Sequence, residues 1–254
     1  MMWVEWAWLI PVVPLVAFPL ILFFGNRIPK GGGALAILAV GVSFLLSLLV
    51  VADVSRGILP QPAAGEEGAG QEVAGVYESS MKWVGLPDAR TPLEAGILVD
   101  HLTCLMLIVV SLIGWLVVIY SVGYMAHEDG KPRYYAEISL FIGVMLGLVL
   151  ANNFLLVFIF WELVGLCSYL LIGFWYRKPE AAAAAKKAFL VTRVGDILFL
   201  VGVITIYSHF GTLNFRDPAA ALDVVEGLAS FMLRKGYRRV GDMVDLVHRG
   251  RDVS

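Results

Sequence analysis

The residues of this 254-residue chain that could do chemistry are charged side chains set inside long apolar runs. Glu162 is the single charged residue between positions 138 and 176. An acid in the middle of a bilayer costs on the order of 2.5–3.5 kcal/mol on insertion scales, so it needs a partner, water or a proton. Reversible protonation is the property that a proton relay uses. The alternative is a glutamate that stays protonated and only packs.

Two further charges, Arg193 and Asp196, lie three residues apart, which places them on one face of a helix, where they can pair. They form either a static ion pair that shapes the fold or a relay in which Asp196 exchanges Arg193 for a nearby lysine. Lys186 and Lys187 precede them at the start of the same apolar run. We interpret Lys186 as a topology signal, one of the basic residues that orient the span in the membrane. Lys187 fits either this role or the relay.

Motifs for other chemistry are missing from the sequence. We find no Walker A loop, no dinucleotide-binding glycine pattern after a strand, no Cys/His ligand spacing and no nucleophile–base pair. Cys104 and Cys167 each lie inside an apolar run, which is typical of small core residues. The chain is therefore expected to bind no nucleotide, flavin, cluster or metal itself.

The elements that must hold these charges are membrane helices. Of the residues, 59% are hydrophobic and 16% charged, and the mean hydropathy is +0.80. Soluble domains have about 45–50% apolar and about 25% charged residues. The composition excludes a soluble enzyme and a disulfide framework, and the net charge of −2 offers no basic footprint for nucleic acid.

Uncharged runs long enough to cross a bilayer predict an all-α integral membrane protein with about six spans. The pair Asn152-Asn153 is the expected turn between the fourth and fifth spans. In the sixth span only residues 197–208 are free of charge, so Arg193 and Asp196 must enter the membrane with it. The expected spans are residues 6–24, 34–52, 102–125, 134–150, 154–176 and 188–208.

Basic residues in the first and fifth connections predict that these are cytoplasmic, so both termini are extracytoplasmic. The sequence divides into helices one and two (1–53), an acidic extracytoplasmic loop (54–98), helices three to six (99–217) and a polar helical tail (218–254). Around Trp83 the loop is expected to form a short hairpin. The basic residues that set the orientation are Arg27, Lys30, Arg177, Lys178, Lys186 and Lys187.

Three strings carry a resemblance to a known family: WELVGLCSYLLIGF at 161–174, KAFLVTRVGD at 187–196 and GTLNF at 211–215. They closely resemble the largest antiporter-like membrane subunit of respiratory complex I, the NADH-quinone oxidoreductase subunit L or chain 5 family. The resemblance covers about residues 1–217 and is strongest over 99–215.

The resemblance implies roles for the charged residues. Glu162 corresponds to the family's essential fifth-helix glutamate, which pairs with a lysine on a seventh helix. Arg193 and Asp196 match charged positions of the sixth helix, and Lys187 matches the lysine where that helix begins. Electron transfer in other subunits would drive protons through this relay in the cell inner (plasma) membrane. NADH, FMN, iron–sulfur clusters and quinone would belong to the partner membrane-arm and peripheral subunits.

The sequence departs from the family after Pro218, where we find no seventh span with the partner lysine and no second repeat. This predicts a truncated, split or frameshifted subunit whose tail is unlike the family. Two alternatives to a complex I subunit stay open. One is a fragment of the large subunit of an Mrp-type sodium/proton antiporter, which shares this core, and the other is a non-functional remnant.

Overall fold

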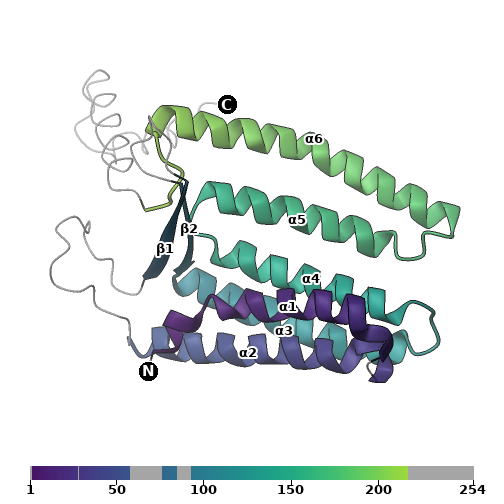
Figure 1. The fold of residues 1–254 in the computed structure, drawn as a ribbon. Coiled ribbons are helices and arrows are strands. Elements are labelled where there is room, and N and C mark those ends of the chain that lie inside the picture. The colour runs from purple at the N-terminus through teal and green to yellow at the C-terminus, as the bar shows by residue number, and fades with distance from the viewer. Residues whose placement is uncertain (1, 28, 58–75, 85–92, 217–254) are drawn as a thin grey trace, which may run out of the picture.

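The computed structural model describes residues 2–27, 29–57, 76–84 and 93–216. Within them six helices lie side by side, each long and apolar enough to cross a bilayer, and a two-stranded sheet crosses one end (Figure 1). The predicted all-α membrane bundle is therefore confirmed, and the chain is a multi-pass membrane protein. The helices are α1 (Leu9–Phe24), α2 (Gly33–Ser55), α3 (His101–Tyr124), α4 (Lys131–Leu150), α5 (Phe154–Ile172) and α6 (Pro179–Phe210).

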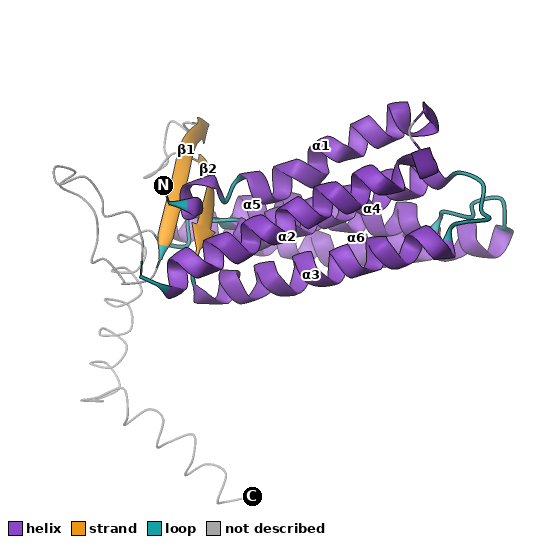
Figure 2. Cartoon of the chain, turned by 90° about the horizontal axis from the view of Figure 1, so that it is seen from below, coloured by secondary structure: helices purple, strands orange, loops and turns teal. Residues whose placement is uncertain are grey.

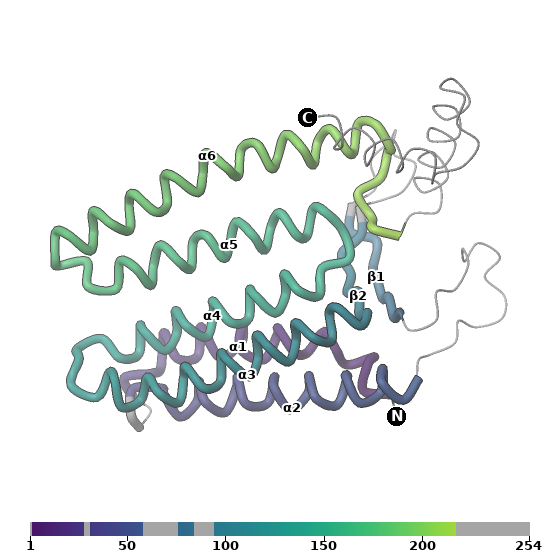
Figure 3. Tube along the Cα trace, turned by 180° about the vertical axis from the view of Figure 1, so that it is seen from behind, coloured from purple at the N-terminus to yellow at the C-terminus, as the bar shows by residue number. Residues whose placement is uncertain are grey.

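The helices form an inner group and an outer pair. Helices α1 to α4 pack on one another and share most of the buried apolar residues. Helix α5 packs on α4, and α6 lies outside α5 (Figures 1 and 3). Helix α5 buries Cys167, and α6 buries Ala185, Asp196 and Val203. The charges singled out by the sequence therefore lie on the thinly covered outer pair.

Prolines inside α1 are tolerated because a neighbouring helix replaces the lost hydrogen bonding. Pro14 has no backbone N–H to donate to the carbonyl of Ile10, four residues earlier. The hydroxyl of Ser43 on α2 donates to that carbonyl at 2.8 Å. A side chain from one helix thus satisfies a backbone group that proline leaves free in another, as expected where water is excluded.

The turn between α4 and α5 falls at Asn152-Asn153, as the sequence predicts. The side chain of Asn153 caps α5 by accepting a hydrogen bond from the backbone N–H of Leu156 at 2.8 Å. Its amide also donates to the carbonyl of Glu94 at 2.7 Å, and the amide of Asn152 donates to the Glu78 carboxylate at 3.0 Å. The turn is therefore attached to the sheet.

That sheet is an antiparallel hairpin of β1 (Tyr77–Val84) and β2 (Leu93–Val99), so the short hairpin expected around Trp83 is confirmed. It lies at the end of the bundle where α1 begins and α6 ends (Figure 2). The connections α1–α2, α3–α4 and α5–α6 lie at the opposite end. We call these the hairpin end and the connection end; which one faces the cytoplasm stays a prediction.

The two expected boundaries that differ most from the structure are the start of the sixth helix and the end of the fifth. Helix α6 begins at Pro179 instead of residue 188, because the run of alanines at 181–185 continues the helix outward and alanine is the best helix former. Helix α5 ends at Ile172 instead of residue 176. The predicted polar tail at 218–254 and part of the predicted loop lie outside the described residues.

Two glycines of α4 allow the close packing that their four-residue spacing predicts. A Cβ added to Gly143 would lie 2.8 Å from Cγ of Leu15 on α1. A Cβ added to Gly147 would lie 2.5 Å from Cε1 of Phe160 on α5. Both distances are too short for two carbon atoms. Helix α4 therefore approaches α1 and α5 more closely than any residue other than glycine would permit at these two positions.

We expect Gly147→Ala to destabilise the protein by about 1–2 kcal/mol, because overpacking forces the Phe160 ring to move. Gly123→Ala is the matched control, since an added Cβ there has no atom within 4 Å and α3 gains helix propensity. Thermal unfolding in detergent, followed by tryptophan fluorescence, measures both variants. Equal melting temperatures for the two variants would contradict the close α4–α5 contact.

Candidate functional site

Glu162 is the ninth of the 19 residues of α5, roughly 12 Å from the hairpin end of the helix. Its carboxylate forms an ion pair with the guanidinium of Arg193 on α6. Nη2 of Arg193 also donates to the backbone carbonyl of Glu162 at 3.1 Å. Gly165, one turn further along α5, leaves room for this contact, since an added Cβ would lie 3.0 Å from Nη2.

Asp196 completes the cluster from the next turn of α6. Its Oδ2 lies 3.5 Å from Nη1 of Arg193, and its Oδ1 accepts a hydrogen bond from the indole N–H of Trp161 at 2.9 Å. The Asp196 side chain is 8% exposed, while those of Arg193 and Glu162 are each 26% exposed. Of the two acids, Asp196 is the more buried, and Trp161 holds its carboxylate in place. Trp161 directly precedes Glu162 in the sequence.

Aromatic rings border the cluster. The guanidinium carbon of Arg193 lies 4.5 Å from the centre of the Phe189 ring. The Trp161 and Phe199 rings meet edge to face, with centroids 6.3 Å apart. Such rings place apolar surface beside the three charged groups, and a less polar surrounding strengthens their electrostatic interactions. We call Glu162, Arg193 and Asp196 the charged cluster.

The structure brings three of the four predicted site residues together. Lys187 is exposed on α6, and in the described part of the chain no ion pair or hydrogen bond joins it to the charged cluster. Lys186 is also exposed. The place of Lys187 in a relay stays a prediction from the resemblance.

The charged cluster can exchange ion pairs through a small movement of the Arg193 side chain. One guanidinium faces two carboxylates, so the three groups together carry a net charge of −1 when both acids are ionised. A net charge is unfavourable in a poorly solvated site. A proton on Glu162 would neutralise the cluster and leave Arg193 paired with Asp196, and its loss would restore the contact with Glu162. The geometry therefore suits acid–base chemistry in which Arg193 is the shared partner.

Sequence reasoning missed a second buried acid. Glu137 on α4 has a side chain that is 8% exposed, and its Oε1 lies 3.3 Å from Nε of Arg133. The signal was the four-residue spacing of an arginine and a glutamate at the start of the fourth span. The search for uncharged runs passed over both residues, although Glu137 falls inside the expected fourth span, 134–150.

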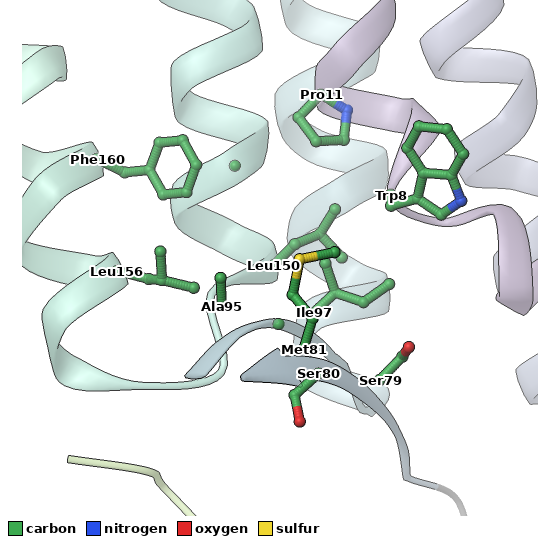
Figure 4. A pocket seen from close by; sticks show the side chains of 12 residues that line it. Trp8, Pro11, Ser79, Ser80, Met81, Ala95, Ile97, Leu150, Leu156 and Phe160 are labelled. Atoms are coloured by element: carbon green, nitrogen blue, oxygen red, sulfur yellow. The ribbon is translucent and has the colours of Figure 1, made fainter. Parts of the chain in front are cut away.

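An apolar cavity of about 500 Å³ lies away from the charged cluster, at the hairpin end (Figure 4). Helix residues Leu150, Leu156 and Phe160 and hairpin residues Met81 and Ile97 line it, and it contains no ionisable side chain. Within the described residues, no group of three or more His, Cys, Asp or Glu side chains could hold a metal ion.

Comparison with known proteins supports the class that the fold and the charged cluster define, an antiporter-like membrane subunit. A family model described as NADH:quinone oxidoreductase/Mrp antiporter, transmembrane, matches residues 151–237. A second, described as NADH-ubiquinone oxidoreductase (complex I) chain 5 N-terminus, matches residues 83–135. The first match shows that the resemblance extends about 20 residues beyond its expected end near residue 217.

Curated relatives agree with the family models. Subunit L of the F420H2 dehydrogenase of Methanosarcina mazei is 48% identical over 204 residues, which are 80% of this chain and 27% of that protein. NADH-quinone oxidoreductase subunit L of Mycobacterium tuberculosis is 36% identical over 234 residues, 90% of this chain and 35% of that protein. The chain belongs to the complex I chain 5 and subunit L family, and spans between about a quarter and about a third of the length of these relatives.

A solved structure shares the fold. It is a chain of the membrane-bound sulfane sulfur reductase, an archaeal respiratory membrane complex, with a TM-score of 0.64 and 20% sequence identity. The similarity covers 82% of this chain and 38% of that chain. At this identity the comparison establishes the helix arrangement alone.

Proposed function

We propose that the chain is part of a proton-translocating membrane subunit of an NADH:quinone oxidoreductase-type respiratory complex. The observation that carries the proposal is the charged cluster midway along α5 and α6, where one arginine is shared by two acids. Protonation of Glu162 would shift Arg193 toward Asp196, and deprotonation would shift it back. Electron transfer in partner subunits would drive this cycle, and those subunits would hold the redox cofactors and the quinone.

The electron donor and the location belong to the same proposal. Relatives are named for NADH-quinone oxidoreductase and for F420H2 dehydrogenase, so NADH and F420H2 are the donors to test. The membrane is the cell inner (plasma) membrane, with the hairpin end extracytoplasmic and the connection end cytoplasmic. This orientation follows from the basic residues of the first and fifth connections.

We expect Glu162→Gln to reduce proton translocation at least tenfold, because glutamine keeps the shape of the side chain but cannot accept a proton. Membrane vesicles from cells that express the chain with its partner subunits are supplied with NADH or F420H2 and a quinone. Internal acidification is followed with a fluorescent dye. Glu180→Gln, an exposed acid in the first turn of α6, is the control and is expected to translocate protons normally.

Unchanged acidification in Glu162→Gln would refute the proposed role of the charged cluster. The second candidate is a subunit of an Mrp-type antiporter, because the first family model also describes Mrp antiporters. The same vesicles distinguish the two candidates. An antiporter subunit would exchange sodium for protons in the absence of any electron donor. A chain that does not copurify with partner subunits would support the third reading, a non-functional remnant.

A further inference from the structure

The Arg133–Glu137 pair is a second ionic site, on the opposite side of α5 from the charged cluster. Arg133 is the third residue of α4, and Glu137 lies one turn deeper, roughly 9 Å from the start of the helix at the connection end. The Arg133 side chain is 37% exposed and that of Glu137 is 8% exposed. The pair therefore links the surface of the connection end to a buried carboxylate.

One oxygen of this carboxylate has no partner. In the part of the chain that the structure describes, three buried side-chain polar atoms lack a hydrogen bond, and all belong to the two arginine–glutamate pairs: Arg133 Nε, Glu137 Oε2 and Arg193 Nε. Buried polar atoms in folded proteins nearly always bond to protein or to ordered water. Glu137 Oε2 is thus an open acceptor for a water molecule or a proton.

Arg133 is anchored independently of Glu137. Its Nη2 donates to the backbone carbonyl of Phe174, just beyond the end of α5. Its guanidinium carbon lies 4.7 Å from the centre of the Phe174 ring and 5.0 Å from that of Tyr176. These contacts keep the cation in place when the carboxylate is neutral, so Glu137 can gain and lose charge without unfolding the site.

The surroundings of Glu137 contain few other ionisable groups. Helices α1, α2 and α3 all pack against α4. Helix α1 has no charged residue, and Asp53 of α2 and His101 of α3 lie near the hairpin end, away from Glu137. On α5 the thiol of Cys167 lies within electrostatic range of Glu137 and is buried. Arg133 on its own helix is the cation. The protonation of Glu137 therefore depends on Arg133 and on the water that reaches Oε2.

The depth of Glu137 places it between the connection end and Glu162. It lies 13 residues from the hairpin end of α4, whereas Glu162 lies 8 residues from the hairpin end of α5. Helices α4 and α5 run side by side (Figure 3). Glu137 is therefore roughly 8 Å closer to the connection end, from the five-residue difference and the rise per residue. Cys167 and Glu162 are five positions apart on α5, so the two acids face different sides of that helix.

We propose that Glu137 is a proton-carrying residue that takes up protons at the connection end and passes them, through water around α5, to Glu162. Uptake forms an O–H bond at Oε2 and neutralises the carboxylate. Release breaks that bond, gives the proton to water and restores the ion pair with Arg133. No electron and no other group moves. The inference rests on the proposed function, since Glu137 would supply protons to the charged cluster.

Infrared titration of the purified subunit in its assembled complex tests the residue without electron transfer. We expect wild-type protein to show the carbonyl band of a protonated carboxylic acid that disappears as pH rises. Glu137→Gln should remove this band, Glu137→Asp should shift it, and Glu180→Gln should leave it unchanged. A band unaffected by Glu137→Gln would overturn the inference. Where Glu137→Gln does not fold, a band unaltered by Glu137→Asp would overturn it equally.

Proton translocation in vesicles separates this inference from the proposed function. We expect Glu137→Gln to translocate protons at least tenfold more slowly than wild type and Glu137→Asp to recover most of the rate. Normal translocation by Glu137→Gln together with loss in Glu162→Gln would overturn the role of Glu137 and leave the charged cluster supported. Normal translocation by both variants would overturn both proposals.

Discussion

Replacing Arg193 by methionine is expected to destabilise the protein by about 3 kcal/mol, roughly a hundredfold in the folding equilibrium. Methionine keeps an unbranched apolar chain but removes the cation that Glu162 and Asp196 share. Asp196 retains the hydrogen bond from Trp161, whereas Glu162 is left without a charged partner in the middle of α5. An unpaired acid at that depth carries a cost of about the same size.

The free energy of unfolding, measured by detergent titration in mixed micelles, checks this effect. Lys187→Met is the matched control, because it makes a comparable change on the same helix at an exposed residue. We expect it to alter stability by less than about 0.5 kcal/mol. Equal destabilisation of the two variants would show that Arg193 contributes no more than a surface cation, and the charged cluster would lose its physical basis.

The second large effect is the coupling between Glu162 and Arg193. Glu162→Met alone should cost under about 1 kcal/mol, because Arg193 keeps Asp196 and the remaining pair is neutral. Combining it with Arg193→Met should restore about 2 kcal/mol relative to Arg193→Met alone, since no unpaired Glu162 remains. The cluster holds two acids and one base, so losing the base is severe and losing one acid is mild.

A complete double-mutant cycle over wild type, both single variants and the double variant measures this coupling in the same micelles. The double variant should be about 1 kcal/mol less stable than wild type, because Asp196 keeps only its hydrogen bond from Trp161. It should still translocate no protons, which separates the stability of α5–α6 from the chemistry. A coupling energy near zero would show that the two side chains act independently. Greater destabilisation by Glu162→Met than by Arg193→Met would reverse the expected asymmetry between acid and base.

The sequence predicted most of the fold because long apolar helices must satisfy their own backbone in a membrane. Six spans, the turn at Asn152-Asn153 and the hairpin near Trp83 follow from local composition and turn chemistry. The start of α6 was missed because counting charges locates the apolar part of a helix. The helix itself begins nine residues earlier, where alanines extend it into a polar segment.

The amino-acid sequence by itself determined that this is a multi-pass membrane chain with acids and bases at bilayer depth, since both features depend on residue type and local spacing. The spacing also predicted that Arg193 and Asp196 can pair within one helix. Tertiary structure decided which charges on different helices meet. It joined Glu162 on α5 to Arg193 on α6, left Lys187 apart, and showed that Glu137 is buried with one oxygen open. Helix contacts between distant segments leave no trace in local spacing, so a side chain's partner and burial emerge only when the helices pack.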